Sequence, residues 1–297
     1  MQNKRDIKNS SLTIDVEEYF QVEAFANNIK VSEWINYPSR IEYQMQLLLN
    51  LLEETQVKAT FFILGFIAEK HPVLIKLIAE KGHEIASHGF NHQHITKQTQ
   101  QIFSNDITKA KLLLEDIISA PVKGYRAPCF SITATNPWAH DEIANAGYLY
   151  SSSTYPIAHD FYGVPKAPRT PYYLDNGLLE IPVSTVKFQN KILPAGGGGY
   201  FRLLPYFIFK RMLKASEKQL DYINFYTHPW EYDPQQPKIK SNAKSNFRHR
   251  VNQGSSLYKL GKLCKAHYFN TLADVHLVKD YPNLGKWTDI ASGDLHK

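Results

Sequence analysis

The chain has 297 residues, 43% hydrophobic and 21% charged, which is the ordinary balance of a globular protein. Lysine and arginine number 34 against 28 aspartates and glutamates, so the formal net charge is +6 with the 12 histidines neutral. Two cysteines imply no disulfide framework, and no run reaches the roughly 18–20 apolar residues that span a bilayer. The first ten residues are polar and lack the apolar region of a signal peptide, so we expect a cytoplasmic protein, with export by another route left open.

Short β-rich runs alternate with amphipathic helical runs along most of the chain. The patterns predict strands over residues 11–16, 59–65, 83–88, 122–126, 148–152, 179–183 and 223–228. They predict helices over residues 41–54, 72–81, 96–119, 137–146, 203–218 and 255–267. This alternation is typical of an α/β fold with a parallel sheet, either open or closed into a barrel.

Polar residues gather where several of these strands end, and in a barrel of parallel strands that edge holds the active site. Asp15 and Glu17 are the first pair. Alternate residues of a strand share a face, so these two carboxylates point the same way. They are suited to act as general base and metal ligand, and the alternative is a pair of solvated acids at the start of a loop.

The second cluster contains two histidines, His88 and His92, in the sequence His-Gly-Phe-Asn-His. Histidines four residues apart lie on one face if the segment turns helically, and a shared metal is a common reason for such a pair. The alternative is a pair of loop histidines that only form hydrogen bonds.

Two further clusters follow later strands. Arg126 is suited to hold a carboxylate by a forked pair of hydrogen bonds, and Pro128 would rigidify the turn and aim the backbone N–H of Cys129 inward. The position of Cys129 beside a proline favours this backbone role over a thiolate nucleophile. His228, at the end of the last strand, is suited to protonate a leaving amine, and the alternative is a core histidine.

Together and in this order, these clusters resemble the motifs of the polysaccharide deacetylase family, which shares the NodB homology domain. The resemblance rests on Thr-Ile-Asp-Val-Glu-Glu (13–18), His-Gly-Phe-Asn-His (88–92), Arg-Ala-Pro (126–128) and Thr-His-Pro (227–229). The runs Asp-Val-Glu-Glu-Tyr-Phe-Gln, Gly-Gly-Gly-Tyr-Phe-Arg-Leu and Phe-Arg-His-Arg are most similar to an exopolysaccharide-associated branch that carries a C-terminal extension. The resemblance implies a distorted (β/α) barrel of the NodB type over residues 11–234. We expect residues 235–297 to be an extension packed on the barrel, and the alternative is that this extension shapes the substrate groove.

The resemblance also implies roles for individual residues. Asp15 matches the general base, His88 and His92 the metal histidines, Arg126 the residue that orients the base, and His228 the general acid, while the backbone N–H of Cys129 faces the oxyanion. The family places its third metal ligand directly after the base, where this chain has Val16, so we expect Glu17 to be the ligand, with Glu18 as the fallback. The family's aspartate partner of the acid is also missing, and Glu180 is the substitute we expect.

The implied activity is hydrolysis of N-acetyl groups on a sugar polymer with one divalent metal ion, expected to be zinc. The setting would be exopolysaccharide or cell-wall glycan metabolism, and the partner an N-acetylated oligo- or polysaccharide. Two alternatives stay open: a metal-independent hydrolase of small cyclic amides and a catalytically silent carbohydrate-binding protein. The sequence leaves the oligomeric state undetermined.

Two segments are ambiguous. Glycines 196–199, followed by Tyr200, would let a sugar chain approach the backbone and stack on an aromatic ring, or they provide flexibility only. A basic run with few acids nearby is more often a solvated surface than a patch for an anionic polymer; its members are Lys238, Lys240, Lys244, Arg248 and Arg250. It lacks the interleaved pattern of nucleic-acid modules, so we expect no nucleic-acid partner.

Overall fold

A computed structural model of the chain describes residues 10–294 apart from residue 27 and residues 159–162. The polar beginning of the chain, on which the expectation of no signal peptide depends, falls outside the described residues except for Ser10. Among the described helices, none combines the length and the apolar character needed to cross a membrane.

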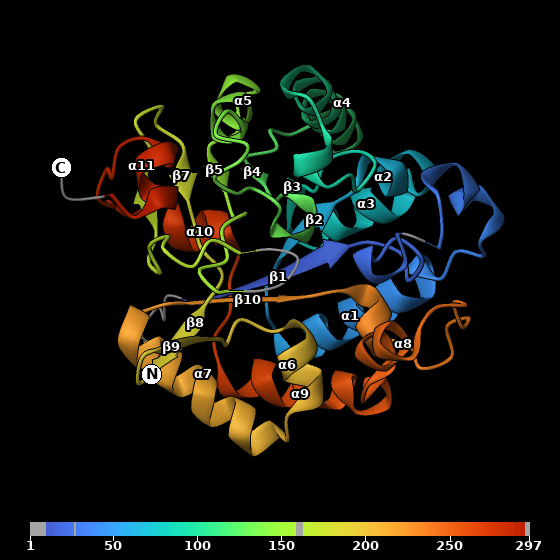
Figure 1. The fold of residues 1–297 in the computed structure, drawn as a ribbon. Helices are drawn as coiled ribbons and strands as arrows, with labels where there is room; N and C mark the ends of the chain where they lie inside the picture. Colours follow the sequence, from blue (N-terminus) through green and yellow to red (C-terminus); the bar gives the residue numbers. More distant parts are fainter. Residues whose placement is uncertain (1–9, 27, 159–162, 295–297) are drawn as a thin grey trace, which may run out of the picture.

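Eight short strands form one curled sheet in the order β10-β1-β2-β3-β4-β5-β7-β6 (Figure 1). Every neighbouring pair is parallel except β6 with β7. The strands are β1 (Ser10–Val16), β2 (Thr60–Ile63), β3 (Glu84–Ser87), β4 (Gly124–Tyr125), β5 (Tyr150–Ser151), β6 (Tyr172–Tyr173), β7 (Leu179–Glu180) and β10 (Ile223–Thr227). This curled, mainly parallel sheet confirms the predicted α/β fold, a distorted barrel (Figure 1).

A separate hairpin lies beside β10, on the side of that strand where the large sheet has no further neighbour among the described residues. It consists of β8 (Thr185–Phe188) and β9 (Lys191–Pro194). The amide of Ser184 donates to the carbonyl of Asn224, and Gly197 forms a bridge with Tyr226. The hairpin therefore links the chain after β7 to β10 and extends the curl of the sheet.

Helices surround the strands (Figure 1). They are α1 (Ile41–Thr55), α2 (Gly65–Lys70), α3 (Pro72–Glu80), α4 (Gln100–Ile118), α5 (Ala139–Asn145), α6 (Gly198–Leu203), α7 (Tyr206–Leu220), α8 (Ala243–Arg250), α9 (Gln253–Ala266), α10 (Leu272–His276) and α11 (Trp287–Ser292). The predicted helix 96–119 begins only at Gln100, because the hydroxyl of Thr99 caps it by accepting from the amide of Ile102. The predicted helix 203–218 is divided into α6 and α7 at Pro205, whose ring cannot continue a helix.

The two faces of strand β1 have different roles, because one packs in the hydrophobic core and the other faces the candidate site. All seven of its residues are buried, so both faces of the strand are covered. Leu12, Ile14 and Val16 belong to the main hydrophobic core. The alternate residues Thr13 and Asp15 therefore point to the opposite face, inside the curl of the sheet, where Arg126 contacts both.

The C-terminal part of the chain returns to the first strand. Helix α9 contacts α1, and α10 contacts β1. The amide of Asn270 donates to the carbonyl of Ser10, and the amide of Leu12 donates back to the carbonyl of Asn270. The division of the chain at residue 234 stays a prediction.

Candidate active site

The parallel register places the site residues in one row. Ile63, Ser87, Tyr125, Ser151 and Glu180 are aligned across β2, β3, β4, β5 and β7. The next residue of four of these strands enters the site, and these residues are His88, Arg126, Ser152 and Ile181. Backbone hydrogen bonds fix these four residues, since the amide of each donates to a carbonyl of the neighbouring strand. Clusters that are far apart in the sequence therefore meet at one edge because the strands share a register.

Glu17, His88 and His92 converge as the sequence predicts. One ligand atom from each lies within 4.8 Å of the other two, and all three side chains are buried. His92 Nε2 lies 2.8 Å from Glu17 Oε2. The helical turn considered for residues 88–92 is not formed, because Gly89 and His92 have φ angles of 75° and 51°. The two imidazole rings nevertheless lie with their centroids 5.3 Å apart.

Glu18, the fallback ligand, faces away from this group. Its carboxylate accepts from the Ser39 hydroxyl and from the amides of Arg40 and Ile41 at the start of α1. This is a capping role, because those amides have no partner within the helix. The two acids, which follow the end of β1 directly, thus point to different sides, with Glu17 toward the site and Glu18 against α1.

The surroundings of His88 prepare one ring nitrogen for a cation. Nδ1 lies 2.8 Å from the carbonyl oxygen of Arg126, which can only accept, so Nδ1 carries the proton and Nε2 keeps its lone pair. Burial lowers the pKa of His88 to about 4, so the ring is neutral at neutral pH. Burial by itself would raise the pKa of Glu17, but the nearby His92 and His228 outweigh it and hold that pKa far below its usual value.

Arg126 holds Asp15, although not by the expected fork. A single nitrogen, Nη1, donates to Asp15 Oδ1 at 2.7 Å and to the Thr13 hydroxyl at 2.7 Å. The other guanidinium nitrogens turn to Ser152, with Nε donating to its carbonyl and Nη2 to its hydroxyl. The guanidinium therefore joins β1 to β5 and leaves Asp15 Oδ2 directed at the cavity side, 4.0 Å from His228 Nε2.

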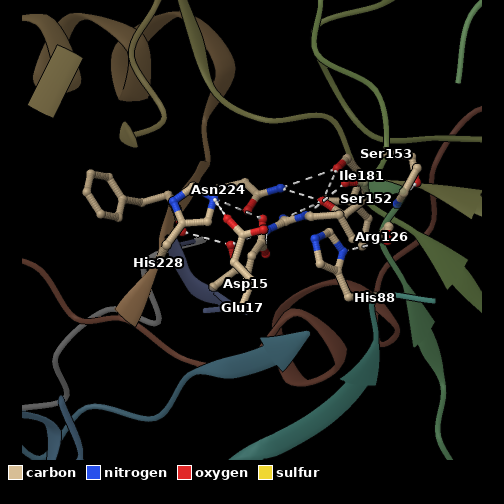
Figure 2. A network of polar contacts seen from close by, with 12 residues as sticks. Asp15, Glu17, His88, Arg126, Ser152, Ser153, Ile181, Asn224 and His228 are labelled. Atoms are coloured by element: carbon tan, nitrogen blue, oxygen red, sulfur yellow. Dashed lines mark hydrogen bonds and ion pairs between the residues drawn. The ribbon is translucent and has the colours of Figure 1, made fainter. Parts of the chain in front are cut away.

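A second layer of polar contacts supports Arg126, and sequence reasoning missed it (Figure 2). The Ser152 hydroxyl donates to the carbonyl of Ile181 at 2.8 Å. The side-chain amide of Asn224 donates to the Ser152 hydroxyl at 3.0 Å and to the carbonyl of Ile181 at 3.3 Å. Both side chains are fully buried. Their only sequence signal is position, since each lies on or directly after a predicted strand.

His228 is held by a residue other than the one predicted. Its Nδ1 lies 2.6 Å from Glu231 Oε1, and its Nε2 points to Glu17 Oε1 at 3.4 Å. Arg202 donates to the other Glu231 oxygen at 3.0 Å. Burial lowers the pKa of His228, but Glu17, Glu231 and Asp15 together outweigh it and raise that pKa to about 9. The imidazole is therefore protonated at neutral pH.

The expected role of Glu180 as partner of His228 is wrong. Its Oε2 lies 3.2 Å from His140 Nε2, and its Oε1 accepts from the amides of Ser153 and Thr154. Glu180 thus fixes the segment after β5. The signal for the true partner was present, because Glu231 stands three residues after His228 and such spacing closes a turn.

Cys129 lines the cavity in a tight turn with a φ angle of 56°. Burial raises the pKa of its thiol well above the usual value, which opposes a thiolate nucleophile. The turn is fixed because the Ser153 hydroxyl accepts from the amide of Ala127, and the Ser131 hydroxyl donates to the carbonyl of Pro128.

A cavity of about 750 Å³ opens over this group. One part of its lining is the polar centre, with Asp15, Glu17, His88, His92 and His228. The remainder comes from segments around it, which include Tyr155, Tyr200, Trp230, Lys244, Phe247 and Arg248. The arrangement combines a buried acid pair, two imidazoles suited to a cation and a protonated imidazole at one open mouth.

Two family models match the chain, and most of the candidate site residues fall within these matches. Residues 42–150 match the family model of the polysaccharide deacetylases, and residues 152–277 match a domain of unknown function, DUF3473. The chain therefore contains a polysaccharide deacetylase domain, which confirms the family that its motifs resemble. The second match is consistent with the branch that carries a C-terminal extension. His88, His92 and Arg126 fall in the first match and His228 in the second, whereas Asp15 and Glu17 precede both.

Individual relatives agree with this family. A peptidoglycan-N-acetylglucosamine deacetylase of Bacillus cereus is 34% identical over 74 residues, which are 25% of this chain and 35% of that protein. The chain thus spans about a third of the length of this relative. The crystal structure of a protein described as a polysaccharide deacetylase from Mycobacterium smegmatis covers 97% of this chain and is itself covered to 91%, with 18% identity and a TM-score of 0.57. An allantoinase structure covers 90% and is covered to 89%, with 15% identity and a TM-score of 0.56.

Proposed function

We propose that this protein removes acetyl groups from N-acetylated sugars of a glycan by metal-assisted hydrolysis. The observation that supports this proposal most directly is the convergence of Glu17, His88 and His92 within 4.8 Å, beside Asp15 and His228. The deacetylase domain that holds His88 and His92 agrees with it, as does the similarity to a peptidoglycan-N-acetylglucosamine deacetylase. Binding alone would need neither a buried general base nor a protonated imidazole.

The three side chains fit a divalent ion. Glu17 Oε2 is buried and accepts no hydrogen bond of good geometry, so it retains lone pairs for a cation. His88 directs an unprotonated Nε2 inward because its Nδ1 is bound to the Arg126 carbonyl. Two imidazoles and one carboxylate are the ligand set of many catalytic zinc sites, and we therefore propose zinc.

The remaining residues supply proton transfers and orientation. A divalent ion held there would polarise the acetyl carbonyl and lower the pKa of the attacking water toward ~7. Asp15, oriented by Arg126, accepts the proton of that water. The backbone N–H of Cys129 faces the oxyanion that forms, where one donor is worth roughly 3 kcal/mol. His228, kept protonated by Glu231, then delivers a proton to the leaving amine.

The test is to replace His88 and His92 separately with alanine, with His94→Ala as the matched control. His94 bonds Thr96 and lies outside the convergent group. Bound metal is measured by mass spectrometry of the elements, and acetate release is measured on a tetramer of N-acetylglucosamine. We expect His88→Ala and His92→Ala to lose both metal and turnover while His94→Ala keeps both. Full turnover by a metal-free His88→Ala variant would end the proposal.

The allantoinase likeness keeps one alternative in view, a hydrolase of small cyclic amides. That alternative needs no metal, so turnover of allantoin that persists after chelation would favour it over glycan deacetylation. The cytoplasmic location stays a prediction, which fractionation of cells producing the full protein would test.

A further inference from the structure

One part of the cavity wall is formed by a short helix that the proposed chemistry does not use. Helix α8 contributes Lys244, Ser245, Phe247 and Arg248 to the lining. Lys244 and Arg248 are four residues apart, so they lie on the same face of the helix. Phe247, with 61% of its surface exposed, lies between them in the sequence. This wall presents two cations and one apolar ring to whatever enters.

Among the described residues, the two cations have no acidic partner. No carboxylate oxygen of the described residues lies within 4.0 Å of a side-chain nitrogen of Lys244 or Arg248. Of the residues that the structure describes, three acids line the same cavity, and each has a basic partner: Asp15 with Arg126, Glu17 with His92, and Glu23 with Lys97 at 3.4 Å. The positive charge of this wall is therefore free to attract an anion.

Stacked rings fix the wall relative to the proton donor. His228 stacks on Trp230 with ring centroids 5.1 Å apart, and Trp230 stacks on His249 with centroids 4.4 Å apart. His249 is buried in α8 and follows Arg248 directly. Arg250 closes the other side by donating to the carbonyls of Gln236 and Pro234. Helix α8 is thus connected to His228 through the rings of His249 and Trp230, and both the helix and His228 line the same cavity.

We propose that the substrate is an anionic glycan, and that Lys244 and Arg248 bind a carboxylate or phosphate carried by the chain beside the N-acetylated sugar. The assignment rests on the deacetylase function proposed above and specifies its substrate class. Arginine and lysine are the usual partners of such groups, and Phe247 offers an apolar face to a sugar ring. A purely solvated cluster would have no reason to line the mouth of the reaction cavity.

Three tetrameric probes test the assignment. They are N-acetylglucosamine units alone, N-acetylglucosamine alternating with glucuronic acid, and N-acetylglucosamine joined through phosphate. Wild type is compared with the double variant Lys244→Gln/Arg248→Gln. The control is Lys210→Gln/Lys214→Gln, which removes the same charge from exposed positions of α7 outside the cavity lining. Acetate release gives kcat and KM, and titration gives Kd at low and high salt.

We expect the better anionic probe to have a KM and a Kd about fivefold to tenfold below those of the neutral probe at low salt, because each exposed charge pair contributes up to ~1 kcal/mol. High salt should erase the difference. The cavity variant should lose it without a change in kcat, whereas the α7 control should keep it. The two anionic probes tell carboxylate from phosphate.

Other results separate the two proposals. If acetate is released but the preference for anionic probes is absent, or is the same in the cavity variant and the control, the anionic substrate is ruled out and the hydrolase stands. If no probe releases acetate while the cavity variant alone loses anion-dependent binding, the anion site stands and the hydrolase does not. Absence of both binding and turnover with all three probes rejects both.

Discussion

At the scale of single residues, the site depends on side chains that never reach the cavity. The Ser152 hydroxyl accepts a hydrogen bond from the guanidinium of Arg126 at 2.9 Å and donates one to the carbonyl of Ile181. Asn224 ties the same hydroxyl to β10. Because Arg126 in turn holds Asp15, the direction of the proposed general base depends on two residues to which we assign no chemical role (Figure 2).

Replacing Ser152 with alanine tests this support. The change removes one acceptor for Arg126 and one donor to Ile181, so we expect the free energy of unfolding to fall by about 1–3 kcal/mol and kcat to fall as well, with bound metal unchanged. Urea unfolding, steady-state kinetics and metal content measure these effects. Ser216→Ala is the control, because Ser216 is fully buried and bonds the Thr185 carbonyl at 2.8 Å away from the site. Equal kcat in both variants would show that Ser152 supports the fold only.

Glu231 provides a second prediction. Its carboxylate helps to raise the pKa of His228, so Glu231→Gln should lower that pKa and leave less of the protonated acid. We expect kcat per folded molecule to fall at least about tenfold, with bound metal retained because Glu231 does not touch Glu17, His88 or His92. Steady-state kinetics and metal analysis of the folded variant measure kcat and bound metal. Loss of metal instead would place Glu231 in the support of the cation.

The convergence of the candidate site residues was predictable from sequence, and the polar contacts that support them were not. Asp15, Glu17, His88 and His92 were recognised because strand alternation and motif order bear directly on them. Ser152 and Asn224 were missed because their importance comes from a register across strands, which no local pattern contains. The predicted partner of His228, Glu180, lies on a strand, whereas the observed partner, Glu231, follows His228 by three residues in a turn.

At the scale of elements, glycines 196–199 approach the protein's own backbone. A side chain on Gly197 would place its Cβ 2.0 Å from the carbonyl oxygen of Tyr226, and its φ angle is 118°. Such a φ angle is strained for other residues. The close approach predicted for a sugar chain is therefore made here to β10. Contact of the loop with a sugar stays a prediction.

Two alanine substitutions separate packing from flexibility in this loop. Gly197→Ala would force the hairpin away from β10, so we expect a large loss of stability, more than about 2 kcal/mol. A Cβ added at Gly199 has no neighbour within 4 Å among the described residues, so Gly199→Ala should change the stability of the protein little. Thermal unfolding of both variants gives the answer, and a stable Gly197→Ala protein would contradict the close packing of this loop on β10.

Element boundaries followed local chemistry where the sequence carried a clear signal. Pro72 begins α3 as expected, and strand β1 ends at Val16 as predicted. The short helix α2 follows the apolar strand β2 directly and begins at Gly65 without a capping side chain, so its exact start carried no local signal. The basic wall was assigned only as a charged run, since nothing in a linear pattern tells that α8 lies over the cavity.

At the scale of the whole molecule, the site requires parts of the chain that belong to different family matches. The residues proposed to bind the cation and the proton donor lie in different segments, and Asn270 pairs with β1 from near the other end of the chain. The site can form only when these segments are folded together, so global stability limits activity.

Acid should weaken that global stability through a buried histidine. Burial and, to a lesser degree, Lys279 lower the pKa of His276 to about 3, against about 6.5 in an unfolded chain. The unfolded state therefore binds the extra proton first, and the stabilisation present above about pH 6.5 is lost as pH falls toward 3. Between about pH 7 and about pH 5, wild type should lose about 2 kcal/mol more than His276→Gln. Urea unfolding at both pH values measures it, and parallel losses would contradict a neutral buried His276.

The central claim is that Glu17, His88 and His92 together hold one divalent ion beside Asp15. X-ray absorption at the zinc edge of the zinc-loaded protein tests this most directly, because scattering from imidazole rings is distinct from that of carboxylates and thiolates. We expect two imidazoles and one carboxylate around the ion, with one imidazole lost in His88→Ala. A spectrum that shows sulfur from Cys129, or no imidazole at all, would contradict it.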